Sequence, residues 1–334
     1  HCSQDQSIAL GKAEEKMGST RDGDASAIAL LLLCACFLTS LACDSNGAKF
    51  GYTGPLGPDH WGGLDPNFTQ CAMGTYQSPV DIKTRDVVYN PTLGPLHREY
   101  TAANATLVDN IFNIAVILLS TKRRLPAFCV QQFAFHPLAA FHCVLVLCDR
   151  SMQLRCEDAA GTVQIDGVKY KLDNIHWHSP SEHTINGERF AVEQHMVHFS
   201  DDGNISVVSI LYRLGRPDPF LMQLQDKLSE LYVEACRAEK GAPIPAGVVN
   251  MWPLRRYANM YYRYVGSLTT PPCTENVIWN IHGRVREMTL GQAAALIAPL
   301  EEGYRRNNRP TQPLNGRTVQ FYRRFWKKKG NGKP

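Results

Sequence analysis

Residues 172–199 read LDNIHWHSPSEHTINGERFAVEQHMVHF, and this stretch decides the fold. It contains two histidines, His176 and His178, separated by one residue. Side chains alternate between the two faces of a β-strand, so both imidazoles point to one face about 7 Å apart. A lone histidine on a strand is more often a satisfied core residue, but two at this spacing favour a shared metal ion.

The end of the stretch supplies a third histidine from what we predict to be the next strand. There Glu193, His195 and Val197 share one face, and His198 lies on the other. An antiparallel neighbour can bring His195 beside the first pair. Three histidines with an open fourth position are typical of catalytic zinc, whereas structural zinc sites close all four positions. Glu193 can accept the free ring N–H of His195 and fix its tautomer.

The sequence outside this stretch predicts a β-rich domain. From about Phe50 onward, Gly, Pro, Asn and Asp break the chain into short apolar runs, as in strands joined by turns. Asp166-Gly167 and Asp202-Gly203 are hairpin signals between the clearest runs. We expect strands at 163–165, 170–178, 190–199 and 205–214, and helices at 220–238 and 289–300, with Thr289 as the candidate cap of the second helix.

The composition is that of an ordinary globular protein, with 44% hydrophobic and 20% charged residues. A disordered chain would have fewer apolar residues and a larger net charge. The formal charge of +4 is small for 334 residues and does not indicate nucleic-acid binding.

The N-terminal segment has the features of a targeting signal. An apolar run at 25–42, after Met17, has the small residues Ser40 and Ala42 near its end, where a signal peptidase would cleave. We expect residues 1–16 to be upstream sequence and 17–43 a cleaved signal peptide. A membrane anchor is the alternative, although the run is short for a span.

Three glycosylation sequons, at Asn67, Asn104 and Asn204, agree with entry into the secretory pathway. The remaining chain, 44–334, is read as one domain interrupted at about 117–154. That interruption follows no strand or helix pattern, and its cysteines and histidines match no zinc spacing. We interpret it as an atypical insertion, from a retained intron or a mis-joined gene model.

Five motifs together point to one family. They are QSPVDI at 77–82, HWHSPSEHTING at 176–187, EQHMVHF at 193–199, GSLTTPPC at 266–273 and NNRPTQPLNGR at 307–317. With them the sequence resembles α-class carbonic anhydrases over about 50–325, and it is most similar to the secreted plant members. The resemblance implies an α+β fold, a single domain around a large, twisted, mostly antiparallel β-sheet. It also implies zinc-dependent, reversible hydration of carbon dioxide to bicarbonate and a proton.

The resemblance assigns roles to individual residues. The implied zinc ligands are His176, His178 and His195, and their implied hydrogen-bond partners are Asn174, the backbone of Asn307, and Glu193. Thr269 would accept a hydrogen bond from the attacking hydroxide and donate its own to Glu182. The implied substrate pocket is formed by Val197, Val207, Leu268, Thr270, Val277 and Trp279.

Two further positions follow from the resemblance. Phe112 lies where many members have a proton-shuttling histidine, so we expect slower turnover with a marked response to small buffers. Cys71 and Cys273 match the disulfide of secreted members, which leaves Cys236 without a partner.

Other functions stay open at this point. A catalytically weak storage or binding protein on the same fold is the main alternative, and an esterase using the same zinc is another. The expected partner is carbon dioxide or bicarbonate, with no nucleic acid and no stable membrane insertion after signal cleavage. The expected location is extracellular, in the apoplast, with a plastid as the alternative.

Overall fold

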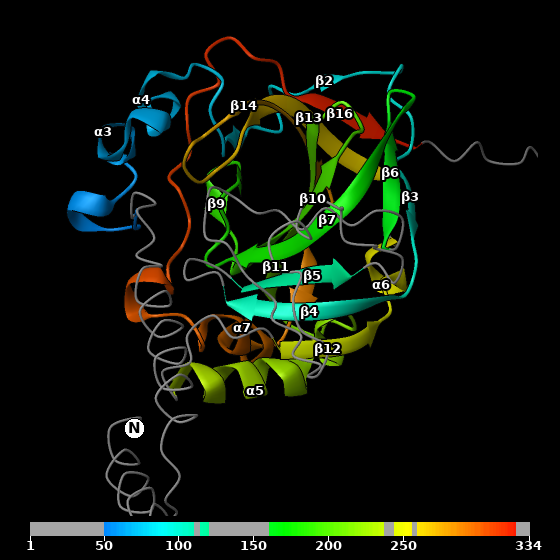
Figure 1. Ribbon diagram of the computed structural model, residues 1–334. Helices are drawn as coiled ribbons and strands as arrows, with labels where there is room; N and C mark the ends of the chain where they lie inside the picture. Colours follow the sequence, from blue (N-terminus) through cyan, green and yellow to red (C-terminus); the bar gives the residue numbers. More distant parts are fainter. Residues whose placement is uncertain (1–49, 110–113, 120–159, 237–243, 256–258, 325–334) are drawn as a thin grey trace, which may run out of the picture. The chain divides into compact units, whose positions relative to one another are not determined.

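One large β-sheet of 13 paired strands organises the described part of the chain (Figure 1). The computed structural model describes residues 50–109, 114–119, 160–236, 244–255 and 259–324. Ten strands follow in the order β12-β4-β5-β7-β10-β11-β14-β13-β16-β2, and β3, β6 and β15 pair beside this path. Most neighbours are antiparallel, but β11 runs parallel to β14 and β15, and β16 runs parallel to β2. The expected mostly antiparallel sheet is therefore confirmed.

The strands of this sheet are β2 Val88–Tyr89, β3 His97–Tyr100, β4 Ala103–Asp109, β5 Ile114–Leu119, β6 Gly161–Ile165, β7 Val168–His178, β10 Val192–Phe199, β11 Ile205–Leu214, β12 Ile244–Val249, β13 Met260–Ser267, β14 Glu275–His282, β15 Arg286–Met288 and β16 Gln320–Arg323. A smaller three-stranded sheet consists of β1 Asp81–Ile82, β8 Thr184–Ile185 and β9 Glu188–Arg189.

The two predicted hairpins form because their turn residues can adopt the left-handed backbone conformation that tight turns need. Asp166 and Gly167 have φ values of 50° and 84°, and these left-handed values are what a tight two-residue hairpin requires. β6 and β7 pair antiparallel across this turn, and β10 and β11 pair across the second one. The expected strands are confirmed with small shifts at their ends, since β7 begins at Val168 and β10 at Val192.

The central strands are buried on both faces, because apolar side chains alternate between two cores. Met196 and Val208 belong to the core that also contains Leu228 of helix α5 (Gln225–Cys236), whereas Val197 and Val207 belong to the core around Trp279. Each fully buried side chain of this size contributes about 1.5–3 kcal/mol relative to an exposed one. Burial on both faces therefore fixes the register of the strands that carry the histidines.

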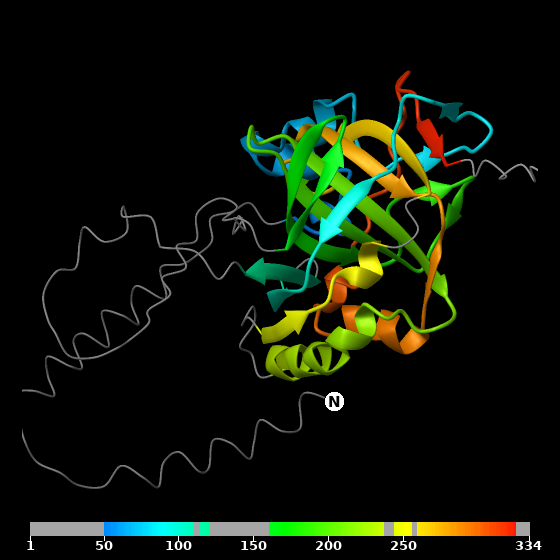
Figure 2. The same ribbon diagram turned by 90° about the vertical axis from the view of Figure 1, so that its right-hand side faces the viewer.

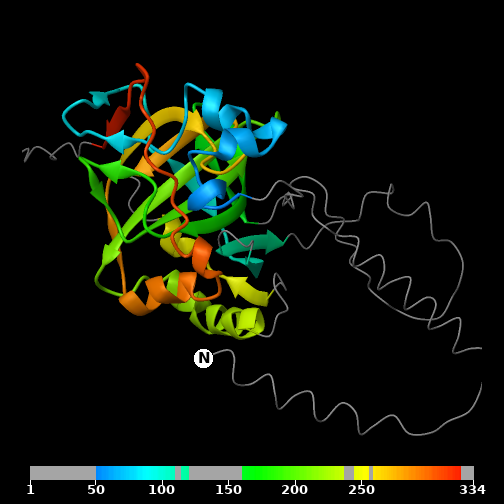
Figure 3. The ribbon, with the colours of Figure 1, turned by 90° about the vertical axis from the view of Figure 1, so that its left-hand side faces the viewer.

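The α-helices of the described residues lie at the edges of the sheet. They are α3 Trp61–Leu64, α4 Gln70–Met73, α5 Gln225–Cys236, α6 Trp252–Arg255 and α7 Leu290–Ile297. Figure 2 shows α5 running alongside β12, and Figure 3 shows α3 and α4, in blue, away from α5. None of the helices in the described ranges is long and apolar enough to cross a membrane.

The two predicted helices are present; the first is described as far as Cys236, and the second is shorter than expected. The first begins as a 3-10 turn at Leu221–Leu224, where Asp218 accepts the N–H groups of Phe220 and Leu221, and continues as α5. The second, α7, starts at the predicted Thr289 cap: the Thr289 hydroxyl accepts the N–H of Gln292, whose side chain accepts the Thr289 N–H. This reciprocal capping box satisfies two N–H groups that have no partner within the helix.

Candidate metal centre

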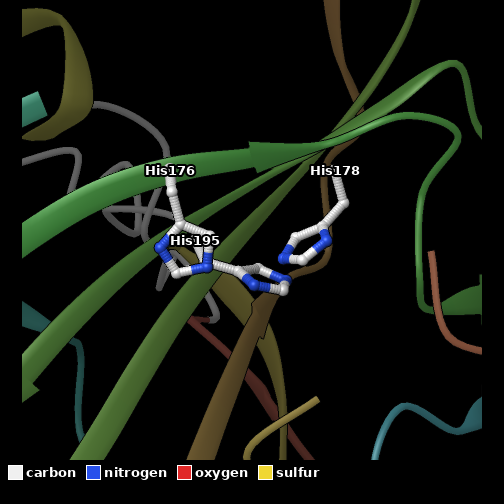
Figure 4. A group of neighbouring side chains, drawn as sticks. All are labelled: His176, His178 and His195. Carbon is white, nitrogen blue, oxygen red and sulfur yellow. The ribbon is translucent and has the colours of Figure 1, made fainter. Parts of the chain in front are cut away.

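Strand register brings the three histidines of the sequence pattern together. His195 on β10 lies directly opposite His176 on β7, and Glu193 lies opposite His178. Alternation along β7 puts His176 and His178 on the same face. The three ring centroids are 4.7–5.2 Å apart, and Figure 4 shows the rings turned toward one another. The sheet thus builds the cluster from two neighbouring strands.

Each ring is held through one nitrogen, which leaves the other nitrogen for the cluster. The Nδ1 atom of His176 is 2.8 Å from Oδ1 of Asn174, and Nδ1 of His178 is 2.7 Å from the backbone oxygen of Asn307. The Nε2 atom of His195 is 2.9 Å from Oε1 of Glu193. These acceptors require N–H donors, so the tautomers present Nε2 of His176, Nε2 of His178 and Nδ1 of His195 to one another.

Burial keeps the three imidazoles neutral at neutral pH. It lowers the pKa of His176 well below its usual value, with further lowering by His195 and His178. Burial also lowers the pKa of His178 to about 4 and that of His195 below its usual value. Metal binding needs neutral imidazoles, so this environment favours the form that binds a metal.

The cluster fits a zinc ion. The histidine nitrogens that could bind a metal lie within 4.8 Å of one another. Tetrahedral Zn–N bonds of about 2.0–2.1 Å would put them about 3.4 Å apart, so only a small movement is needed. Nε2 of His178 is buried and has no hydrogen-bond partner, and a buried nitrogen in that state calls for a ligand. Among the described residues, no fourth His, Cys or acidic side chain joins this group. The arrangement matches zinc sites that keep one position open.

Glu193 is the most heavily hydrogen-bonded carboxylate at the site. Its Oε1 accepts from His195, from Nδ1 of His183 at 2.7 Å and from the hydroxyl of Ser209 at 2.6 Å. Its Oε2 accepts the backbone N–H groups of Glu182 and His183 at 2.8 and 2.7 Å. Burial alone would raise the pKa of Glu193, but its electrostatic interactions and hydrogen bonds with His183 and His195 lower it well below its usual value. Glu193 is therefore a fixed anion.

Glu182 lies beside the cluster, within 4.0 Å of His178 and His195, and Thr269 is hydrogen-bonded to it. Burial raises the pKa of Glu182 to about 7, although His195, the N–H of Arg309 and the hydroxyl of Thr269 each lower it. The backbone N–H of Arg309 donates to Oε1 of Glu182 at 2.9 Å. The other carboxylate oxygen, Oε2, is buried and makes no hydrogen bond within 3.5 Å. Both side chains are almost fully buried, so the pair is shielded from bulk water.

Most of the predicted pocket residues form one apolar wall. Val197 on β10 pairs with Val207 on β11, which in turn pairs with Trp279 on β14. Val277 belongs to the same buried cluster, and Leu268 packs against it half-buried. The ring of His195 is 4.8 Å from that of Trp279, so the wall adjoins the histidines. Thr270 is half-buried and is not part of this cluster.

Of the remaining predicted residues, some lie in the part of the chain that the structure describes and others lie outside it. Cys71 and Cys273 form a disulfide across 202 residues. The expectation that Cys236 has no partner is wrong, because Cys236 is also disulfide-bonded. Asn67, Asn104 and Asn204 are all exposed, as glycan acceptors must be. Phe112, the segments 1–16 and 17–43, and most of 117–154 lie outside the described residues.

Sequence reasoning missed four residues that support the site. His183 and Ser209 donate to Glu193, Tyr264 bonds His183, and the buried Arg309 donates to Glu182. His183 stands inside the quoted histidine motif, so its position was a usable signal. Tyr264 and Arg309 are 81 and 127 residues from their partners, and no local pattern connects them.

A large, mostly antiparallel sheet with three histidines converging from two adjacent strands defines a protein with a candidate metal site. Comparison with known proteins gives the family. The model of the family described as eukaryotic-type carbonic anhydrase matches residues 142–323. The chain belongs to this family.

Its relatives include plant proteins. The chain is 37% identical to alpha carbonic anhydrase 7 of Arabidopsis thaliana, over 80% of this chain and 82% of that protein. It is 34% identical to dioscorin dioA3 of Dioscorea japonica, over 90% of this chain and 96% of that protein.

Solved structures agree on the fold. A crystal structure of dioscorin complexed with ascorbate matches with a TM-score of 0.68 and 34% identity, covering 83% of this chain and 99% of that one. The α-carbonic anhydrase of Thermovibrio ammonificans, in complex with the inhibitor sulfanilamide, matches with a TM-score of 0.63 and 30% identity, covering 82% and 100%. The expected α-carbonic anhydrase fold is thus confirmed.

Proposed function

We propose that this chain catalyses the zinc-dependent, reversible reaction of carbon dioxide with water to give bicarbonate and a proton. The observation that carries the proposal is the convergence of three neutral histidine nitrogens, with no fourth protein ligand among the described residues. The ligands would be Nε2 of His176, Nε2 of His178 and Nδ1 of His195. Zinc held this way acts as a Lewis acid and, in carbonic anhydrases generally, lowers the pKa of a coordinated water to about 7.

The chain's own residues would orient the reactants. In its ionised form, Glu182 can accept the hydroxyl proton of Thr269, which leaves the Thr269 oxygen free to accept a hydrogen bond from the attacking oxygen. That arrangement directs a lone pair of the attacking oxygen toward carbon. The wall of Val197, Val207 and Trp279 offers carbon dioxide an apolar surface where it need not compete with hydrogen-bonded water.

Stopped-flow carbon dioxide hydration tests the proposal. The protein should start near Asp44, retain residues 117–154 and have its zinc content measured. We expect activity that is abolished by a chelator and by an aryl sulfonamide. One bound zinc per chain without activity would contradict the proposal and favour the alternative, a catalytically weak storage or binding protein. That alternative draws on the similarity to dioscorins.

Proton release is expected to limit turnover, because the family resemblance puts Phe112 at the shuttle position and phenylalanine cannot carry a proton. Phe112→His should raise kcat in weak buffer by up to about 10²-fold, the lower range for a positioned acid–base group. Added imidazole should stimulate the wild-type protein more than the variant. Equal, buffer-independent kcat values for both proteins would show that another route carries the proton.

The proposed location is the secretory pathway, ending in the apoplast, with a plastid as the alternative. The exposed sequon asparagines Asn67, Asn104 and Asn204 and the Cys71–Cys273 disulfide support this route. Glycosidase treatment of the protein from its native tissue should lower its apparent mass on a gel. An unchanged mass would count against passage through the secretory pathway.

A further inference from the structure

A cavity of about 580 Å³ shares no lining residue with the candidate metal centre. Its walls come from residues 213–219 at the end of β11 and beyond it, from Trp252 and Pro253 of α6, and from residues 284–287 before and within β15. Cavities of about 300–1,000 Å³ are the usual size of small-molecule sites in proteins. This cavity is therefore large enough to hold a ligand of its own.

The walls of the cavity carry more positive than negative charge. The charged residues that line it are four arginines and two carboxylates, namely Arg213, Arg216, Arg284, Arg286, Asp218 and Glu287. Four positive charges against two negative ones leave a formal charge of +2. The planar, forked guanidinium group matches carboxylate and phosphate oxygens in geometry as well as in charge. The cavity therefore suits an anion that carries one of these groups.

Strand register places the arginines at one wall. β11 runs parallel to β15, and this pairing puts Arg213 opposite Glu287 and Tyr212 opposite Arg286. Glu287 then accepts hydrogen bonds from Arg213 and Arg216, both at 2.8 Å. The side chains of these two arginines are 65% and 85% exposed. A dissolved anion can therefore reach them while Glu287 keeps them beside the cavity.

Arg286 is a fixed positive charge in the wall. Its guanidinium pairs with Asp218, donates to the backbone oxygen of Pro253 at 3.3 Å and lies 5.5 Å from the ring centre of Tyr212. Arg98 is buried nearby: burial, together with the charge of Arg286, lowers the pKa of Arg98 to about 10. Like charges are thus held close together on this side of the sheet. An anion in the cavity would offset their repulsion.

An exposed tryptophan supplies an aromatic surface to the same cavity. Trp252 lines it and is 49% exposed, whereas tryptophan side chains are on average highly buried. Its backbone N–H donates to Oδ1 of Asn250 at 2.9 Å, and the backbone of Asn250 is hydrogen-bonded in both directions to the side chain of Gln223. Pro253 and Leu254, which follow, are buried. The backbone is thus anchored on both sides of Trp252 and holds its ring at the cavity wall.

We propose that this cavity binds a small aromatic anion, a flat ring that carries a carboxylate or a phosphate group. The ring would stack on Trp252, and the anionic group would bind Arg284 and Arg286. A simple inorganic ion would use only the arginines, and an uncharged ring would use only the tryptophan. The inference does not depend on the proposed function, because no residue of the metal centre lines the cavity.

Calorimetric titration with cinnamate and with phenyl phosphate tests the proposal and shows which anionic group is preferred. We expect at least one of them to bind with a Kd below about 1 mM, more weakly in high salt, and equally to zinc-loaded and zinc-free protein. The matched controls are 3-cyclohexylpropanoate, which has the charge and carbon count of cinnamate without its flat ring, and inorganic phosphate. Each should bind about tenfold more weakly than its aromatic counterpart. Equal binding of probe and control, or binding only to the zinc-loaded protein, would overturn the inference.

Substitutions of exposed residues locate the binding. Trp252→Ala should weaken the binding of the better probe by about tenfold, and Trp252→Phe, which keeps a flat ring, should recover most of the affinity. Arg284→Gln should weaken binding by about tenfold through the loss of a charged donor. Arg323→Gln removes an equally exposed charge on β16, outside the cavity, and should leave the affinity unchanged. Wild-type affinity in both Trp252→Ala and Arg284→Gln would contradict the proposal.

A further substitution should strengthen binding, a result that misfolding cannot imitate. Glu287→Gln removes the carboxylate that competes with the ligand for Arg213 and Arg216. The affinity for the better probe should therefore rise by up to about fivefold, which corresponds to one exposed ion pair. A fall in affinity, or no change, would contradict the charge argument on which the inference rests. A protein that binds the probe but does not hydrate carbon dioxide would contradict only the proposed function.

Discussion

Glu193 and Glu287 both accept hydrogen bonds from basic side chains, yet their surroundings are opposite. Glu193 lies between central strands with no exposed surface and accepts five hydrogen bonds. Glu287 on β15 accepts from Arg213 and Arg216 at 2.8 Å, and these arginines are 65% and 85% exposed. Water can replace the partners of Glu287 but not those of Glu193. We therefore expect the loss of the Glu193 hydrogen bonds to cost more free energy of unfolding than the loss of the Glu287 hydrogen bonds.

The largest effect is expected at the buried member of the pair. Glu193→Ala would leave several buried donors without an acceptor, so the free energy of unfolding of the zinc-free protein should fall by at least about 3 kcal/mol. Zinc affinity should weaken by about 10–100-fold because His195 loses its partner. Urea unfolding and chelator competition measure the two effects. A Glu193→Ala variant with the wild-type free energy of unfolding and the wild-type zinc affinity would contradict the idea that burial makes the contacts of Glu193 more important than those of Glu287.

An intermediate effect is expected at the capping box of α7, near Glu287. Thr289→Ala removes the acceptor for the N–H of Gln292 and should lower the free energy of unfolding by about 1 kcal/mol. Thr289→Ser, which keeps the hydroxyl, is the matched control and should unfold nearly like the wild type. Zinc affinity should not change in either variant. A change in zinc affinity would show that the edge of the sheet is coupled to the histidines.

The smallest effect is expected at Glu287, the half-buried member of the pair, whose arginine partners are exposed. Hydrogen bonds from Arg216 and Arg213 lower the pKa of Glu287 to about 2, so its contribution to stability is present above the ordinary glutamate pKa and is lost as the pH falls toward 2. At neutral pH, Glu287→Gln should shift the urea midpoint only slightly, and less in high salt. A large, salt-independent shift would mean that these arginines are more shielded than their exposure indicates.

Much of the local structure could be predicted because its causes are local. The Asp166-Gly167 turn, the alternation along β7 and the Thr289 cap each depend on neighbours a few residues away. Placing His176 opposite His195 needed only the assumption that two consecutive strands pair. The parallel pairing of β11 with β14, which puts Trp279 beside Val207, joins residues 72 apart and has no local signal.

The supporting residues of the site were harder to predict for the same reason. The resemblance to a family supplied Thr269 and Glu182, which local patterns alone could not connect. His183 was visible in the motif, but its hydrogen-bond partner Tyr264 lies 81 residues away along the chain, and Ser78, which bonds Tyr264, is 186 residues from it. Hydrogen-bond partners of a buried group are set by tertiary packing. They become evident only when the strands are in place.

The Cys71–Cys273 disulfide has a consequence for the order of events during synthesis. Its 202-residue span encloses all three zinc-binding candidates, and at about 5–20 residues per second the second cysteine is made roughly 10–40 s after the first. Five other cysteines, at 129, 143, 148, 156 and 236, are made in that interval. Cys71 therefore meets five competing thiols before its native partner exists. Correct pairing is a question of timing as well as geometry, and an oxidoreductase that reshuffles early bonds should raise the yield of active protein.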